Sequence, residues 1–133
     1  MEIVNHEYFV HLEVAKLLKE AGFDWKCNGV FISEDGTQYT FIKMDAAWDS
    51  NNSKYNQYNI SAPTLEVAQR WLREVKGILL YMTPKRVNME WKWNFWYIDL
   101  RDKTNIEQRY STKNFNTYEK AQEAGIKKAL ELL

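Results

Sequence analysis

Residues 89–100 read MEWKWNFWYIDL, and their character alternates with a period of two. The odd positions are large and mostly aromatic: Met89, Trp91, Trp93, Phe95 and Tyr97. The even positions begin with Glu90, Lys92 and Asn94 and then become apolar at Trp96 and Ile98. Because successive side chains of a strand point to opposite faces, this pattern predicts a β-strand with one aromatic face. Its second face is polar only in the first half.

Three segments carry apolar residues at helical spacing. The first runs from about His6 to Ala21 and is ended by Gly22; its expected core residues are Tyr8, Leu12, Ala15 and Leu18. The second lies between Ser61 and Gly77, and its expected core residues are Leu65, Ala68, Trp71, Leu72 and Val75. The third begins at Asn116 or Thr117, where Asn116 and Glu119 resemble a capping box, and its expected core residues are Tyr118, Ala121, Ala129 and Leu133.

Further strands are expected before and after residues 89–100. VFISEDGTQYTFIK predicts a hairpin, because Asp35 and Gly36 favour the positive φ angles of a tight turn. ILLYMT predicts a strand buried on both faces, which Pro84 either ends or confines to a sheet edge. IEQRYST predicts a more polar edge strand. The segment from Asp45 to Asn59 is polar and lacks either period, so it predicts a loop.

The expected element order is α-β-β-α-β-β-β-α. Since strands and helices do not alternate regularly, the order indicates an α+β fold, with a mainly antiparallel sheet of about five strands covered by three helices. The length of 133 residues fits a single domain over residues 1–133.

Charge and cysteine content narrow the classes of function. Lys plus Arg and Asp plus Glu number 18 each, so no net field attracts nucleic acid or an acidic membrane. Cys27 is the single cysteine, which rules out an internal disulfide and is ordinary in a reducing compartment. No segment approaches the ~18 apolar residues of a membrane span. We therefore expect a cytoplasmic protein, monomeric or a small homo-oligomer.

Motifs for metal binding and catalysis are weak. His6 and His11 lie five residues apart, which does not place both on one helical face. A calcium-loop rhythm that begins at Asp49 fails, because Lys54 stands where the turn glycine belongs. We expect no metal, no cofactor and no catalytic residue, and hence no enzyme. The weaker alternative is a small enzyme that uses the loop carboxylates Asp45 and Asp49.

The aromatic strand has two interpretations. It could serve as a stacking platform for single-stranded nucleic acid, with binding candidates Lys92, Trp93, Phe95, Arg101, Lys103 and Arg109. Alternatively, its aromatic face forms the floor on which the helices pack. The face that is exposed decides between the two.

One segment points to a family. ISAPTLEVAQRWLREVKGI resembles the SAPT…WLREV signature of small uncharacterised proteins from gut Bacteroidetes genomes and their prophages or other mobile elements. KLLKEAGFDWKC and YEKAQEAGIKKAL are similar to the terminal segments of the same group. Together they cover about a third to half of the chain. The resemblance implies an origin on a mobile element and transfers no functional residue.

The leading hypothesis is a non-enzymatic accessory protein that binds a host or phage protein, for example as an inhibitor of a defence protein. Aromatic residues near charges make good interface anchors. The protein-binding candidates are Trp48, Asp49, Tyr55, Tyr58, Trp91 and Trp93.

Overall fold

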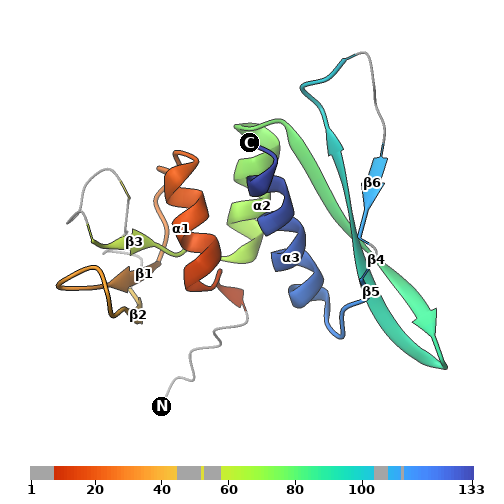
Figure 1. Ribbon diagram of the computed structural model, residues 1–133, viewed down its shortest axis with the longest axis horizontal. Helices are drawn as coiled ribbons and strands as arrows, with labels where there is room; N and C mark the ends of the chain where they lie inside the picture. Colours follow the sequence, from red (N-terminus) through yellow and green to blue (C-terminus); the bar gives the residue numbers. More distant parts are fainter. Residues whose placement is uncertain (1–7, 45–51, 53–57, 104–107, 112) are drawn as a thin grey trace. The chain divides into compact units, whose positions relative to one another are not determined.

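The computed structural model describes residues 8–44, 52, 58–103, 108–111 and 113–133 (Figure 1). The chain forms two compact units, Met1–Glu66 and Val67–Leu133. The described residues contain three helices and six strands in two antiparallel sheets. The prediction of an α+β fold is confirmed, whereas the prediction of about five strands in one sheet differs from what is observed. A single domain stays a prediction.

The helix of the first unit is α1, Leu12–Glu20. Gly22 adopts a φ of 95° just after its C-terminal cap, as predicted, and Phe23 N–H donates to the Leu18 carbonyl at 2.9 Å. The predicted start at His6 is wrong, because the backbone before α1 pairs with another segment: Phe9 bridges to Thr64, and Val10 N–H donates to the Pro63 carbonyl at 3.0 Å. Tyr8 is consequently 55% exposed rather than part of the core.

The first sheet has the strand order β2-β1-β3. Its strands are β1, Gly29–Ile32, β2, Thr40–Lys43, and β3, Ile60–Ser61, and both pairings are antiparallel. The predicted hairpin is confirmed, but its turn is not a tight two-residue one: residues 33–39 join β1 to β2, and of the pair Asp35 and Gly36 only Gly36 has a positive φ, 80°. Thr37 N–H donates to Asp35 Oδ1 at 2.9 Å within this loop. β3 is an addition to the predicted order, because Ile60 and Ser61 pair with β1 at the end of the polar segment.

The second unit begins within α2, Leu65–Glu74. Trp71 of this helix is 1% exposed, and Gly77 follows with a φ of 71°, as expected for a residue that ends a helix. Val75 lies just past α2 and is exposed, so its expected place in the core is wrong.

The second sheet has the order β4-β5-β6. Its strands are β4, Ile78–Val87, β5, Glu90–Asp99, and β6, Gln108–Tyr110. The β4–β5 register runs without interruption from Ile78 opposite Asp99 to Val87 opposite Glu90. β4 continues through Pro84, and this is tolerated because β4 is an edge strand. Of the two roles expected for Pro84, the edge position is the one observed.

The last helix, α3, spans Tyr118–Glu131, and its N-cap is Thr117, whose side chain accepts a hydrogen bond from Lys120 N–H. The helix packs on the aromatic face of β5 at Gly125, where a Cβ atom would lie 2.5 Å from Leu80 Cδ1 and 3.1 Å from Phe95 Cβ. A side chain at this position would force Leu80 or Phe95 to shift, so glycine suits this close approach. Leu133 lies past the helix end and is exposed, so its expected burial is wrong.

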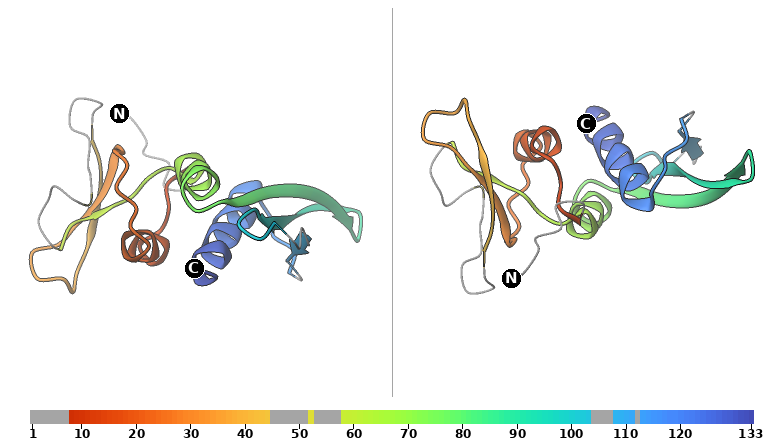
Figure 2. Two further views of the ribbon diagram at one scale, coloured as in Figure 1. Left: turned by 90° about the horizontal axis from the view of Figure 1, so that it is seen from above. Right: turned by 90° about the horizontal axis from the view of Figure 1, so that it is seen from below.

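Two glutamines connect the elements of this unit. Gln122 on α3 is buried, and its Nε2 donates to Gln69 Oε1 on α2 at 2.8 Å. Gln69 Nε2 in turn donates to the Leu80 carbonyl on β4 at 2.7 Å. Figure 2 shows the β4–β5 ribbon with α3 lying across part of it, so that the turn end of the ribbon extends past the helix.

Candidate functional site

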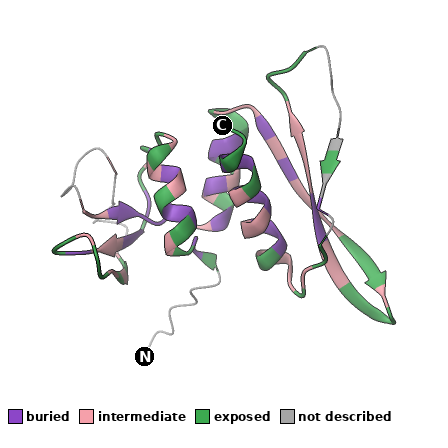
Figure 3. Cartoon of the chain, in the orientation of Figure 1, coloured by how far each residue is buried: buried purple, intermediate pink, exposed green. Residues whose placement is uncertain are grey.

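The aromatic face predicted for residues 89–97 changes from exposed to buried along its length, from Met89 in the turn to Tyr97 near the end of β5. Met89 is 85% exposed and Trp91 61%, whereas Phe95 is 7% exposed. Trp93 and Tyr97 are half-buried. Figure 3 shows the same gradient in colour, with the turn end of the hairpin exposed and the part beside α3 buried. The interpretation as a floor for the helices therefore applies to the middle of the strand, which packs against α3, whereas the turn end is exposed surface.

The open part is the hairpin tip, defined here as residues 84–92. Its turn consists of Asn88 and Met89, with φ angles of 51° and 66°, between the paired residues Val87 and Glu90. Two consecutive positive φ angles are typical of a type I′ turn, in which glycine usually occupies the second position. A residue with a Cβ in this conformation costs about 1–2 kcal/mol. The turn thus holds a methionine in solvent at some cost in stability.

Trp91 lies beside a cation on the same face of the ribbon. The Arg86 guanidinium lies over the indole, 5.8 Å from the ring centroid, and the two residues face each other across the strands. Lys85 and Lys92 are opposite one another on the other face, and Lys92 Nζ lies 3.3 Å from Glu90 Oε2. Three cations against one carboxylate give the tip a charge of +2.

Trp93 connects the tip to the packed region. Its N–H donates to the Phe115 carbonyl and its carbonyl accepts from Phe115 N–H, both at 2.8 Å. Its indole meets the ring of Tyr118 edge-on, with centroids 5.2 Å apart. Trp93 therefore holds the base of the tip, while Trp91 is the more accessible of the two predicted tryptophans.

The opposite face carries an aromatic pair that sequence reasoning did not single out. Tyr81 and Trp96 stack with centroids 6.2 Å apart and planes 8° apart, and Trp96 Nε1 donates to Thr83 Oγ1 at 2.9 Å. Both rings are half-buried. The signal in the sequence is the change of the even positions to apolar at Trp96, but only the register shows that Tyr81 lies opposite.

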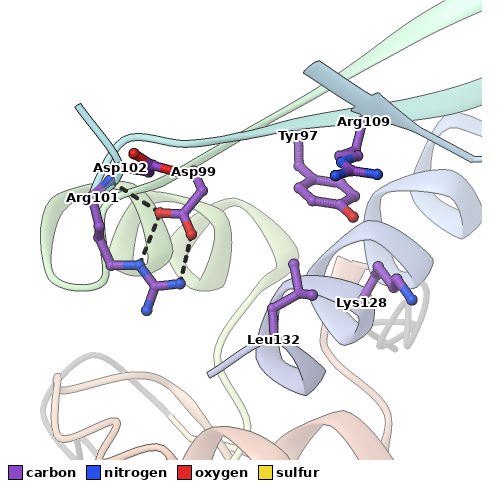
Figure 4. A pocket seen from close by; sticks show the side chains of 7 residues that line it. All are labelled: Tyr97, Asp99, Arg101, Asp102, Arg109, Lys128 and Leu132. Carbon is purple, nitrogen blue, oxygen red and sulfur yellow. Dashed lines mark hydrogen bonds and ion pairs between the residues drawn. The ribbon is translucent and has the colours of Figure 1, made fainter. Parts of the chain in front are cut away.

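A charged hollow of about 370 Å³ lies at the other end of β5 (Figure 4). Its walls are Tyr97, Asp99, Arg101, Asp102, Arg109, Lys128 and Leu132. The Arg101 guanidinium donates two parallel hydrogen bonds to the Asp99 carboxylate, from Nε to Oδ1 at 2.8 Å and from NH2 to Oδ2 at 2.7 Å. These bonds lower the pKa of Asp99 and raise that of Arg101. Asp99 therefore remains an anion at neutral pH and is not prepared to donate a proton.

The nucleic-acid candidates do not form one surface. Lys92 and Trp93 belong to the tip, and Phe95 is in the core. Arg101 and Arg109 come together only at the charged hollow, and Lys103 is exposed beyond the end of β5. A stacking platform along the whole strand is therefore absent from the described residues.

The candidates in the polar segment are mostly outside the described residues. This applies to Trp48, Asp49 and Tyr55, and also to Asp45 of the enzyme alternative. Tyr58 is described; it is half-buried in the first unit, with its ring against Gly36 of the hairpin turn.

In the described part of the chain, no three His, Cys, Asp or Glu side chains gather to hold a metal ion. No helix there is both long enough and apolar enough to cross a membrane. Comparisons with protein-family models, curated proteins and solved structures found no match. The resemblance to mobile-element proteins thus stays a prediction, and any function must be argued from geometry.

Proposed function

We propose that this protein acts by binding another protein, with the hairpin tip as its contact surface and Trp91 as the anchor. The observation that carries the proposal is the exposure of Trp91, 61%, next to Met89, 85%, on a continuously paired two-stranded ribbon. Tryptophan, methionine and arginine are the residue types enriched at protein interfaces, and Arg86 completes that set.

The contrast between the buried part of the ribbon and its exposed tip supports this proposal. Leu80 and Phe95 lie under Gly125 and form the core, while the tip extends beyond α3 (Figure 2). Because the backbone of the ribbon is already paired, binding costs little additional backbone entropy, and preorganisation raises affinity for that reason. An apolar anchor carried beyond the core is more useful for binding than for stability.

The proposed partner is a host or phage protein, in keeping with the resemblance to proteins of mobile elements. Under this proposal the molecule is an accessory factor, for example an inhibitor of a defence protein, and has no catalytic role of its own. The commitment of Asp99 to Arg101 agrees with that view, because the best-defined carboxylate of the charged hollow is already paired.

Quantitative capture from a host lysate, with and without phage infection, tests the proposal. The baits are the wild-type chain, Trp91→Ala, and Tyr8→Ala as a matched control, because Tyr8 is an aromatic residue of similar exposure in the first unit. We expect proteins that Trp91→Ala loses and Tyr8→Ala retains, with melting temperatures showing all three baits folded. Equal recovery from wild type and Trp91→Ala would refute the role of the tip.

A further inference from the structure

We propose that the partner offers an apolar slot bordered by carboxylates, and that the tip enters it through side chains rather than by adding a strand. This inference rests on the proposed function and specifies the chemistry of the partner.

The two faces of the tip differ in chemistry. Residues that alternate along a strand point to opposite faces, so the cross-strand pairs Pro84–Trp93 and Arg86–Trp91 share one face. That face is apolar and aromatic, with the Arg86 guanidinium over the indole. It suits a slot deep enough for one indole, with an anion near its rim.

The other face carries an unfavourable pair of like charges. Lys85 and Lys92 are directly opposite one another in the register, and like charges in that position destabilise a sheet. Of these two lysines, only Lys92 has its charge compensated by Glu90. Among the described residues, neither Lys85 nor Arg86 has a carboxylate partner. Carboxylates on the partner would supply the missing counter-charge on both sides of the tip.

Strand addition at the β4 edge is obstructed. Trp93 exchanges both hydrogen bonds with Phe115, so its neighbour on β4, Pro84, directs its backbone groups toward the free edge. Proline has no N–H to offer there. Four residues earlier, the Leu80 carbonyl is already bonded by Gln69 Nε2 at 2.7 Å. With two of its outward-facing positions closed, this edge is a poor template for another strand.

The position of Glu90 favours a protein over a nucleic acid. Its carboxylate is exposed next to the turn and would face phosphates in any complex that the tip made with a nucleic-acid backbone. The chain as a whole is neutral, with 18 cationic and 18 anionic residues, so no wider field offsets that repulsion. A protein partner can place its carboxylates beside Lys85 and Arg86 alone and leave Glu90 without a facing anion, which an evenly charged phosphate backbone cannot do.

The test reverses charge at the tip. The variant is Lys85→Glu with Arg86→Glu, and the control is Lys26→Glu with Lys103→Glu, two exposed lysines outside residues 84–92 that give the same change of net charge. Both are used as full-length baits beside wild type and Trp91→Ala, in nuclease-treated lysate at low and high salt. Fluorescent single-stranded and duplex DNA oligonucleotides serve as direct probes.

For the proteins that wild type captures, we expect the recovered amount to fall by about tenfold with the Lys85→Glu, Arg86→Glu variant, equivalent to about 1.4 kcal/mol of binding free energy. The control variant should recover the same amount as wild type. The captured proteins should also elute earlier at high salt. If Trp91→Ala lost the captured proteins but the charge-reversed variant retained them fully, the proposal of a slot bordered by carboxylates would be wrong, whereas the proposed function would stand. Retention by both variants would overturn both proposals. Tight, salt-sensitive binding of either oligonucleotide, lost on charge reversal, would replace both with a nucleic-acid partner.

Discussion

Two replacements of Met89 distinguish its effect on the stability of the turn from its effect on partner binding. Met89 holds a φ of 66° and is 85% exposed, so its side chain buries little apolar area while its Cβ strains the turn. Met89→Gly removes both the strain and the side chain. Met89→Ala removes most of the side chain but keeps the Cβ, and therefore keeps the strain.

The expected magnitudes follow from the backbone. Left-handed conformation costs a residue with a Cβ about 1–2 kcal/mol, and the extra chain entropy of glycine offsets about 0.5–1 kcal/mol of the relief. We therefore expect Met89→Gly to raise the free energy of unfolding by about 0.5–1 kcal/mol, and Met89→Ala to stay within about 0.5 kcal/mol of wild type. Both should reduce capture of the partner, because both remove the thioether.

Urea denaturation followed by circular dichroism gives the two free energies, and capture from lysate gives the binding. A Met89→Gly variant less stable than Met89→Ala would refute the reasoning about turn strain. Full capture by both variants would show that Met89 is not part of the contact surface.

Three further predictions concern the second unit. Trp71→Ala should lower the free energy of unfolding by about 3–5 kcal/mol because the side chain is 1% exposed, and an unchanged urea midpoint would show that its burial is misassigned. Thr117→Ala should cost about 1 kcal/mol by leaving Lys120 N–H without its cap, whereas Thr117→Ser should restore most of the loss in the same assay. The Asp99–Arg101 pair should make stability depend on pH: the pKa of Asp99 is lowered from 3.8, so its contribution is present above that value and is lost as pH falls through the lowered pKa. Arg101→Ala should reduce this acid-induced loss in unfolding measured from pH 7 downward, and identical pH profiles would contradict the assignment.

Local signals predicted the ends of elements well. Gly22, Gly36 and Gly77 were expected at helix ends or a tight turn, and all three have positive φ angles. Such positions depend on one or two residues, so the sequence alone reveals them. The α+β class followed from the order of those elements.

Features that depend on distant partners could not be predicted. The start of α1 moved to Leu12 because Phe9 and Val10 pair with a segment more than 50 residues later in the sequence. The division into two sheets likewise depends on which strands meet, and β3 shows no period of its own over two residues.

The candidate surface was predicted in part. Period-two alternation placed Trp91 and Phe95 on one face, but it could not tell that α3 reaches Phe95 at Gly125 and stops short of Trp91. Exposure depends on where the covering helix ends, which is a property of tertiary packing. The turn at Asn88 and Met89 was missed because methionine replaces the glycine that signals a type I′ turn.

The pair Gln69 and Gln122 bears on how uniquely the second unit assembles. Leucines at these positions would let α2 and α3 shift by a turn and still bury apolar surface, since such contacts are not directional. The Gln122–Gln69 and Gln69–Leu80 hydrogen bonds instead form at one alignment, and a shift would break both of them at buried Gln122 and half-buried Gln69. The two glutamines therefore favour a single alignment of α2, α3 and β4. The end of the ribbon that packs on the helices, opposite the tip, then has one position and not several.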